Sequence, residues 1–267
     1  MWLQGLDAAP KLVKQCVHSW QRHNPDWKIN ILDEQNLKEY IEVDGFVGRN
    51  RATITMQAFA NIVRTNLLAT FGGVWADATC FCCQPLDAWL GDYMATGFFA
   101  FEKPRPDRLL SNWFLASGKN CHLTKTFCTA TNSYWMKNHF PFQNKSWARK
   151  IIKGLGKILN RNARLASLWV HPLTAKVLRI HPYFWHHYTF YRVVTTDERS
   201  GELWRQTPKI SADIPLRLQR TGLLKPLSAE FKTIIDGRKY PLHKLNWRCD
   251  AASAPGCNLD YLLRSQS

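Results

Sequence analysis

The sequence is short of acidic side chains. It carries 20 Asp and Glu against 36 Lys and Arg in 267 residues, so its formal net charge is +16 and its sequence pI about 9.7. Such a surplus draws a protein toward anions. Four kinds of partner fit it: nucleic acid, an anionic lipid leaflet, a diphosphate-containing donor and an acidic glycan. Charge alone does not choose among them.

Long apolar runs are also missing. No stretch is long enough to span a bilayer, and no segment has the pattern of a secretory signal. We therefore expect the eight cysteines to be reduced thiols in the cytoplasm. Cys80, Cys82 and Cys83 lie close together, but this spacing lacks the second half of a zinc site. Repeats, low-complexity linkers and a disordered composition are absent too.

What the chain does have is apolar and aromatic residues. Hydrophobic residues make up 45% of it, and Trp occurs 12 times. This composition supports one α/β domain with an appended lobe, or one domain and a small second one. Aromatic side chains in such numbers also line sugar sites, because a ring face packs on the apolar C–H face of a pyranose.

The first 32 residues show a strand pattern, then a helix pattern, then a second strand pattern. Residues 1–4 predict a short strand, residues 10–23 have the apolar spacing of a helix, and residues 27–32 alternate as a second strand. A strand–helix–strand start predicts a parallel sheet.

The clearest predicted helix covers residues 57–70. Gly72 and Gly73 end it, since glycine readily takes the left-handed C-cap conformation. Residues 74–82 then form an almost uninterrupted apolar run, which is typical of a central strand buried on both faces. Asp77 is the one charged residue in that run. A carboxylate is costly to bury alone, so we expect it to meet a ligand or, alternatively, to cap a turn or pair with Arg64.

These residues resemble a known family. Residues 71–79, with the Asn-Ile-Val-Arg block at 61–64, are similar to the core of the capsular polysaccharide synthesis proteins, relatives of the glycosyltransferase family 32 sugar transferases with a DXD motif. Further similar segments extend over nearly the whole chain: 2–5, 9–10, 19–20, 24–27, 211–213 and 241–247.

The resemblance implies a fold and a division of the chain. The expected class is α/β, GT-A-like (Rossmann-like), with a mixed, mostly parallel sheet flanked by helices and a C-terminal helical or irregular lobe. Residues 1–140 would form the nucleotide-sugar-binding core. Residues 141–267 would form the acceptor side and C-terminal lobe, with a soft boundary or none.

The resemblance also implies a donor site. In the superfamily a Ser-Asp-x-x-Arg helix block and an Asp-x-Asp strand end hold the ribose and a divalent metal on the diphosphate. By position Asp77 matches the first Asp of the strand motif and Arg64 matches the Arg, whereas Thr79 and Asn61 replace two expected aspartates. A hydroxyl is a poor ligand for Mn²⁺ or Mg²⁺ beside a carboxylate. Metal dependence is therefore in doubt: either Asp77 binds the ion with help from His243, or basic side chains replace it.

The site residues implied in this way fall into three groups. The expected catalytic residues are Asp77, Arg64 and Asp213. The expected metal ligands are Asp77 and His243. The expected donor-binding residues are Trp2, Gln4, Asn61, Arg64, Gly73, Asp77, Thr79 and Lys244.

Several of these residues have plain structural alternatives. Arg64 and Lys244 are candidates for the positive charge at the departing phosphates, although Lys244 is equally an exposed lysine. His243 is alternatively a packed histidine, and Asp213 a turn cap. His186 and His187 could bind sugar hydroxyls or belong to an aromatic core.

The expected function is transfer of a sugar from a nucleotide sugar, a UDP-sugar foremost, to a hydroxyl of a glycan or lipid-linked acceptor in capsular or surface polysaccharide synthesis. The resemblance to family 32 implies that the anomeric configuration is retained. Thr79 and Asn61 keep open an alternative, an inactive relative that acts as a binding subunit. A nucleic-acid-binding protein is a weaker alternative, because no motif of that class is present.

One basic segment stands apart. Seven basic residues fall within twenty positions that contain no acid: Lys145, Arg149, Lys150, Lys153, Lys157, Arg161 and Arg164. They form either a solvated helix face or a surface that meets anionic lipid head groups. The second reading predicts a cytoplasmic protein bound peripherally to the inner membrane face.

Overall fold

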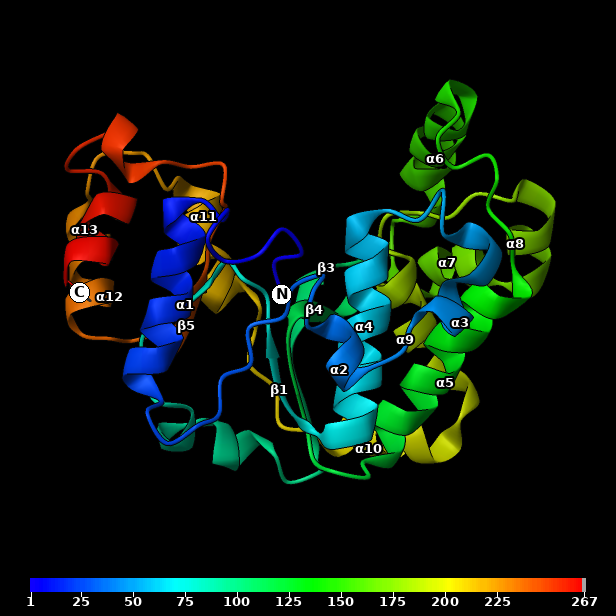
Figure 1. Cartoon of the computed structure of the whole chain (residues 1–267), viewed down its shortest axis with the longest axis horizontal. Helices are drawn as coiled ribbons and strands as arrows, with labels where there is room; N and C mark the ends of the chain where they lie inside the picture. Colours follow the sequence, from blue (N-terminus) through cyan, green and yellow to red (C-terminus); the bar gives the residue numbers. More distant parts are fainter. Residues whose placement is uncertain (266–267) are drawn as a thin grey trace. The chain divides into compact units, whose positions relative to one another are not determined.

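The computed structural model describes residues 1–265 and shows two compact units, each assembled from separate stretches of chain (Figure 1). Unit 1 consists of Met1–Lys38, Ala76–Tyr93 and the described residues from Ile210 onward. Unit 2 consists of Glu39–Trp75 and Met94–Lys209. The expected division of roles near residue 140 stays a prediction.

Unit 1 is a small two-stranded sheet covered by helices. Strand β2 (Cys80–Cys82) pairs antiparallel with β5 (Leu242–Lys244). Helix α1 (Lys11–His23) packs on β2 and helix α11 (Asp213–Thr221) on β5. The remaining elements of unit 1 are η2 (Leu86–Ala88), η3 (Leu90–Tyr93), α12 (Ala229–Asp236), η5 (Ala251–Ser253) and α13 (Asn258–Ser265).

The core of unit 1 joins residues that are distant in sequence. Leu12 and Cys16 of α1 and Phe81 of β2 are buried in one cluster with residues of α11, α12 and α13. The helical spacing of apolar residues predicted for 10–23 is thus confirmed in α1. Burial of that stripe stabilises the helix, which has no side-chain N-cap.

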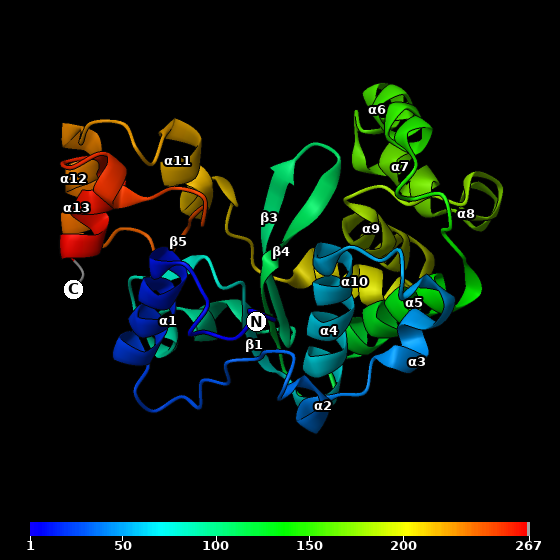
Figure 2. The ribbon, with the colours of Figure 1, turned by 45° about the horizontal axis from the view of Figure 1, so that its top comes forward.

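Unit 2 is built on a three-stranded sheet with the order β1-β4-β3. Strands β3 (Phe98–Arg105) and β4 (Arg108–Ser117) form a long antiparallel hairpin, visible beside α4 in Figure 2. The other elements are β1 (Gly73–Ala76), α3 (Asp44–Val47), η1 (Gly48–Asn50), α4 (Met56–Phe71), α5 (His122–Lys137), α6 (Ser146–Leu159), α7 (Ala163–Ala166), η4 (Ser167–Val170), α8 (Pro172–Leu178), α9 (Trp185–Thr196) and α10 (Glu198–Gln206). The short helix α2 (Leu37–Tyr40) precedes them.

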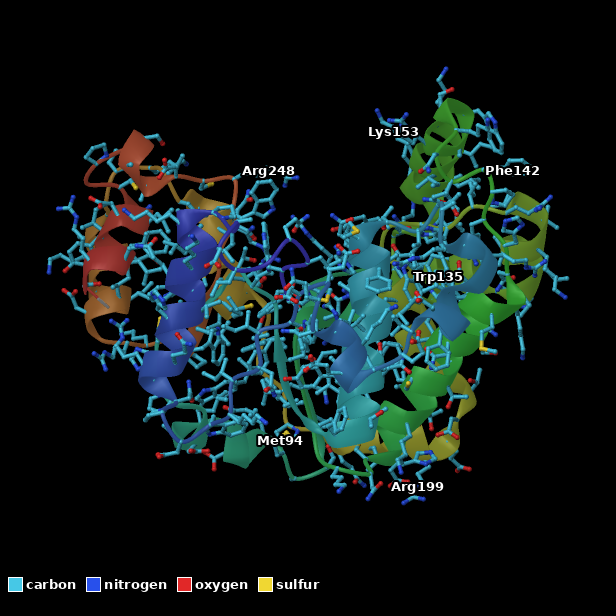
Figure 3. The ribbon with its side chains drawn as sticks, viewed as in Figure 1. Met94, Trp135, Phe142, Lys153, Arg199 and Arg248 are labelled. Carbon is cyan, nitrogen blue, oxygen red and sulfur yellow. The ribbon has the colours of Figure 1, made fainter. Side chains whose placement is uncertain are left out.

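Aromatic rings fill the interior of unit 2. Phe190 of α9 contacts Phe98 of β3 and Phe127 of α5, with ring centroids 5.8 and 5.2 Å apart. Trp135 and Trp185 lie edge to face at 5.3 Å, and Figure 3 shows Trp135 among the helices of the unit. Many of the twelve tryptophans and fourteen phenylalanines therefore serve packing, which reduces the number left for a sugar site.

Helix α4 confirms the clearest helix prediction. Thr55 caps its start, because the hydroxyl oxygen accepts a hydrogen bond from the Ala58 amide at 3.2 Å. Gly72 ends it with φ +73° and ψ −154°, a conformation that only glycine adopts without strain. A Cβ at Gly72 would also lie 2.8 Å from the Lys119 amide nitrogen. The glycine is required there by both backbone conformation and close packing.

The predicted parallel sheet was wrong. The described residues form two small antiparallel sheets of three and two strands in a mostly helical protein, with no Rossmann-like parallel sheet. Residues 1–4 and 27–32 are not strands, although the Trp2 amide donates to the Leu32 carbonyl at 2.8 Å and the Glu34 amide to the Leu3 carbonyl at 3.1 Å. Apolar alternation shows which side of a segment is buried but does not supply a neighbouring strand. These two isolated bonds make no ladder.

The predicted central strand over residues 74–82 was also wrong. The run is split into β1 and β2 by a turn in which the Cys80 amide donates to the Asp77 carbonyl at 2.8 Å. Asp77 and Thr79 are residues that favour turns over strand interiors. Asp77 therefore sits in a turn, where its side chain retains 28% exposure.

Candidate functional site

The turn between β1 and β2 presents Asp77 and Thr79. The strand pairing continues past β2, because the Leu245 amide donates to the Thr79 carbonyl at 2.8 Å. In this register Cys80 lies opposite Lys244. The pairing of β2 with β5 therefore brings a lysine from the C-terminal part of the chain to the turn.

Lys244 joins the two turn residues. Its Nζ lies 3.4 Å from Asp77 Oδ2 and donates a hydrogen bond to the Thr79 hydroxyl. The Lys244 side chain is 15% exposed and that of Asp77 28% exposed. Charge-assisted hydrogen bonds in such a half-buried position are stronger than those of a fully solvated surface pair. The result is an ammonium group held at a fixed place in the turn that precedes β2.

The same arrangement fits a divalent cation poorly. The Lys244 ammonium lies beside the one carboxylate of the turn, where a metal would need a vacant anionic ligand. Within residues 1–265 no group of three or more His, Cys, Asp or Glu side chains could hold a metal ion. The expected partner His243 precedes Lys244 in β5, so its side chain points to the opposite face of the strand. It is 1% exposed and lies 5.8 Å from the Tyr240 ring, and burial lowers its pKa to about 4.

A pair of tryptophans flanks the chain near its start and after β5. The rings of Trp2 and Trp247 meet edge to face with centroids 6.0 Å apart, and Trp247 is 43% exposed. The Arg248 guanidinium lies 4.6 Å from the Trp247 ring centroid. Gln4, also expected at the donor site, is exposed. Trp247 and Arg248 follow Lys244 within four residues, so one short segment carries an ammonium, an aromatic face and a guanidinium.

The residues expected on the helix block lie in the interior of unit 2. Arg64 is 4% exposed, donates to the carbonyl oxygens of Ala60 and Asn112, and lies 5.0 Å from the Trp75 ring centroid. Asn61 is 6% exposed, and its side-chain oxygen accepts a hydrogen bond from the Asn112 side-chain Nδ2 at 2.8 Å. These contacts tie α4 to β4 and Trp75. Roles of Arg64 and Asn61 in donor binding stay predictions, as does that of the exposed Gly73.

The buried network extends to His186 on α9. Its Nε2 lies 3.0 Å from the Thr65 hydroxyl and its Nδ1 3.3 Å from the Asn112 side-chain nitrogen. Burial, followed by the charge of Arg64, lowers the pKa of His186 well below its usual value. The neighbouring His187 is 7% exposed. The aromatic-core interpretation of this segment therefore has direct support from its packing.

Comparison with known proteins identifies the family. Residues 1–144 match the family model described as capsular polysaccharide synthesis protein. The chain belongs to this family. It is also 25% identical over 153 residues to the O-glycosyltransferase braB of Annulohypoxylon truncatum, a match that covers 50% of this chain and 36% of that relative. The chain thus matches about a third of the relative's length, and no solved structure matches it.

The remaining expected residue of this capsular polysaccharide synthesis protein is Asp213. It is the first residue of α11, its side chain is 67% exposed, and it forms an ion pair with Arg220. A carboxylate at a helix N-terminus also interacts favourably with the helix dipole. The Asp213 carboxylate pairs with Arg220 and forms no capping hydrogen bond among the described residues, so the turn-cap alternative and the acceptor role both stay predictions.

Sequence reasoning did not single out Trp247 and Arg248, which the structure places three and four residues after Lys244. A signal was present, because the segment 241–247 was already recognised as similar to the family. The sequence does not show that this segment pairs with the strand after the Asp77 turn, nor that Trp247 contacts Trp2. Among residues 1–265 no helix has both the length and the apolar character needed to cross a membrane.

Proposed function

We propose that this protein transfers a sugar from a nucleotide-activated donor, a UDP-sugar foremost, to a hydroxyl of a glycan or lipid-linked acceptor in capsular or surface polysaccharide synthesis. Membership in the family and the similarity to an O-glycosyltransferase support sugar transfer in general. The observation that carries the finer proposal is the Lys244 ammonium held by Asp77 and Thr79 in the turn that corresponds to the family's DXD position.

The reaction suits that arrangement. The acceptor oxygen forms a bond to the anomeric carbon while the bond from that carbon to the diphosphate breaks, and its electron pair leaves with the nucleoside diphosphate. The acceptor hydroxyl gives its proton to an oxygen of the departing diphosphate. Negative charge therefore grows on the departing phosphate, and a fixed cation at that place lowers the barrier. In this proposal Lys244 is the cation, Asp77 orients it and binds donor hydroxyls, and the configuration at the anomeric carbon is retained.

Trp2, Trp247 and Arg248 are proposed to hold the rest of the donor. Flat aromatic faces accept either a nucleobase or a sugar ring, and a guanidinium adds a second positive charge for the diphosphate. The half-exposed Trp247 ring, carried three residues after Lys244, is the main support. This arrangement needs little or no divalent metal, because Lys244 supplies charge at the place where the ion would act.

The test combines a screen of nucleotide sugars with an Asp77 variant. Binding is measured by calorimetry and turnover by release of the nucleoside diphosphate, each with Mn²⁺ and with EDTA. Asp77→Asn should abolish binding of the active donor, whereas Asp92→Asn, an exposed carboxylate of the same unit, should leave it unchanged. Failure of every nucleotide sugar to bind the wild type, or unchanged binding in folded Asp77→Asn, would refute the proposed site.

A second candidate function is donor binding without transfer. It is favoured by one observation, that Asn61 and Thr79 both stand where the superfamily has aspartates. The screen separates the two functions, because a binding subunit would show calorimetric affinity for a nucleotide sugar and no release of diphosphate with any acceptor.

A further inference from the structure

Helix α6 (Ser146–Leu159) stands out from the rest of unit 2. Figures 1 and 2 show it projecting from the unit in both views, and its main packing partner is the short helix α7. Ala148 is its one buried residue. A helix of 14 residues that buries so little is not held by packing alone, so its exposed side chains need another explanation.

One edge of α6 is apolar and open to solvent. Trp147, Ile151, Leu155 and Ile158 recur at intervals of four, four and three residues, which places them on one side of a helix. Trp147 is 42% exposed, Leu155 36% and Ile158 55%. Exposed apolar side chains gathered in this way mark an interaction surface.

The side of the helix opposite this edge is basic. Arg149, Lys150, Lys153 and Lys157 are all exposed, and α6 contains no acidic residue. None of the four forms an ion pair within the part of the chain that the structure describes. Figure 3 shows the Lys153 side chain directed away from the body of unit 2.

We propose that α6 binds an anionic lipid surface and lies in its plane. The apolar edge would enter the boundary between head groups and acyl chains, and the four basic residues would meet the lipid phosphates. An acidic polysaccharide or a nucleic acid would neutralise the charges but leave Trp147, Leu155 and Ile158 in water. A lipid surface accounts for both halves of the helix, and charge complementarity decides that it is anionic. The proposal does not depend on the proposed sugar transfer.

Three variants test it. The charge variant replaces the basic residues of α6 by Gln: Arg149, Lys150, Lys153 and Lys157. The apolar variant keeps the charge and replaces three exposed residues by Gln: Trp147, Leu155 and Ile158. The control variant removes the same number of charges elsewhere in unit 2, again by substitution with Gln: Lys119, Lys125, Arg199 and Arg205. In Figure 3 Arg199 lies at the end of unit 2 away from Lys153.

Binding is measured by flotation with vesicles of phosphatidylcholine alone and of phosphatidylcholine with phosphatidylglycerol. Each basic residue near an anionic surface is worth roughly a fivefold change in binding, so the charge variant should bind the mixed vesicles about a hundredfold or more weakly at low salt. The control variant should stay within about twofold of the wild type. The apolar variant should lose roughly tenfold, with the loss persisting at salt that screens charges.

Other outcomes would overturn the proposal. Wild-type protein that ignores the anionic vesicles at low salt refutes it, and heparin binding lost in the charge variant would then assign the helix to an acidic glycan. Equal losses of vesicle binding in the charge and control variants would show that the overall positive charge of the protein, and not a surface on α6, causes the binding. Circular dichroism checks folding, and nucleotide affinity measured on the same variants should not change. A failure of lipid binding is thereby distinguishable from a failure of the proposed sugar transfer.

Discussion

Replacing Lys244 by Met removes the ammonium from the Asp77 turn and keeps most of the apolar stem. The structure sets the expected size of the effect. The Lys244 Nζ is 3.4 Å from Asp77 Oδ2, and the two side chains are 15% and 28% exposed. Loss of one partner of a buried hydrogen-bonded charge pair costs about 2–5 kcal/mol in a complex. Because solvent reaches part of this pair, we expect the lower end of that range.

A loss of about 2–3 kcal/mol corresponds to roughly 30- to 150-fold weaker binding of a nucleoside diphosphate. Calorimetry with UDP in EDTA measures it. Lys244→Arg should recover much of the affinity, since it restores a positive charge. Lys239→Met, which removes an exposed lysine from the same unit, is the matched control and should bind as the wild type does.

A double variant sharpens the test of metal dependence. Thr79→Asp together with Lys244→Met exchanges the ammonium for a second carboxylate, and nucleotide binding should then require Mn²⁺. The reasoning fails if Lys244→Met binds as tightly as the wild type. It also fails if EDTA abolishes binding by the wild type, because a metal would then act where we place the lysine.

Three further predictions concern stability. Gly72→Ala should lower the free energy of unfolding by about 2–4 kcal/mol, because the new Cβ adds a steric clash to backbone strain. Gly73→Ala, at φ +86° with open space around it, should lower it by only about 1–2 kcal/mol, and equal losses in urea unfolding would contradict this reasoning. Burial lowers the pKa of His243 from 6.5 to about 4, so this side chain stays neutral in the folded state at pH 5, whereas in the unfolded chain it binds a proton. The free energy of unfolding should therefore fall by about 2 kcal/mol from pH 7 to pH 5 on account of His243. His243→Gln should remove this part of the pH dependence. Asp197 caps α10 by accepting from the Ser200 amide at 2.8 Å, and Asp197→Ala should cost about 1 kcal/mol at neutral pH in the same assay. Hydrogen bonds from Ser200 and then His122 lower the Asp197 pKa from 3.8 to about 2, so this contribution is complete above pH 3.8 and is lost as the pH falls toward 2.

Local features were well predicted where the chain itself carries the cause. The helix over 57–70 appears as α4, and Gly72 ends it, because the apolar stripe and the glycine act within a few residues. The helical spacing at 10–23 appears as α1 for the same reason. The family could be recognised because its motifs are contiguous segments, and the family model matches residues 1–144.

The sheet could not be predicted because strand partners lie far apart. The run at 74–82 has the apolar content of a strand, but the competing turn at Asp77 and Thr79 divides it between two sheets. Residues 1–4 and 27–32 become strands only if another strand lies beside them and forms a regular series of backbone hydrogen bonds with them. Alternation within one segment contains no information on that neighbour.

For the candidate site too, some features follow from the sequence and others only from the tertiary structure. The sequence alone shows the charge surplus, the lone Asp77 with Thr79 at the motif position, and the acid-free basic segment at 145–164. The tertiary structure alone decides that Lys244, 167 residues from Asp77, contacts it, and that His243 beside it is buried. It also decides that the apolar edge of α6 stays open to solvent. Composition and local spacing act along the chain, whereas strand pairing and burial depend on which distant residues meet.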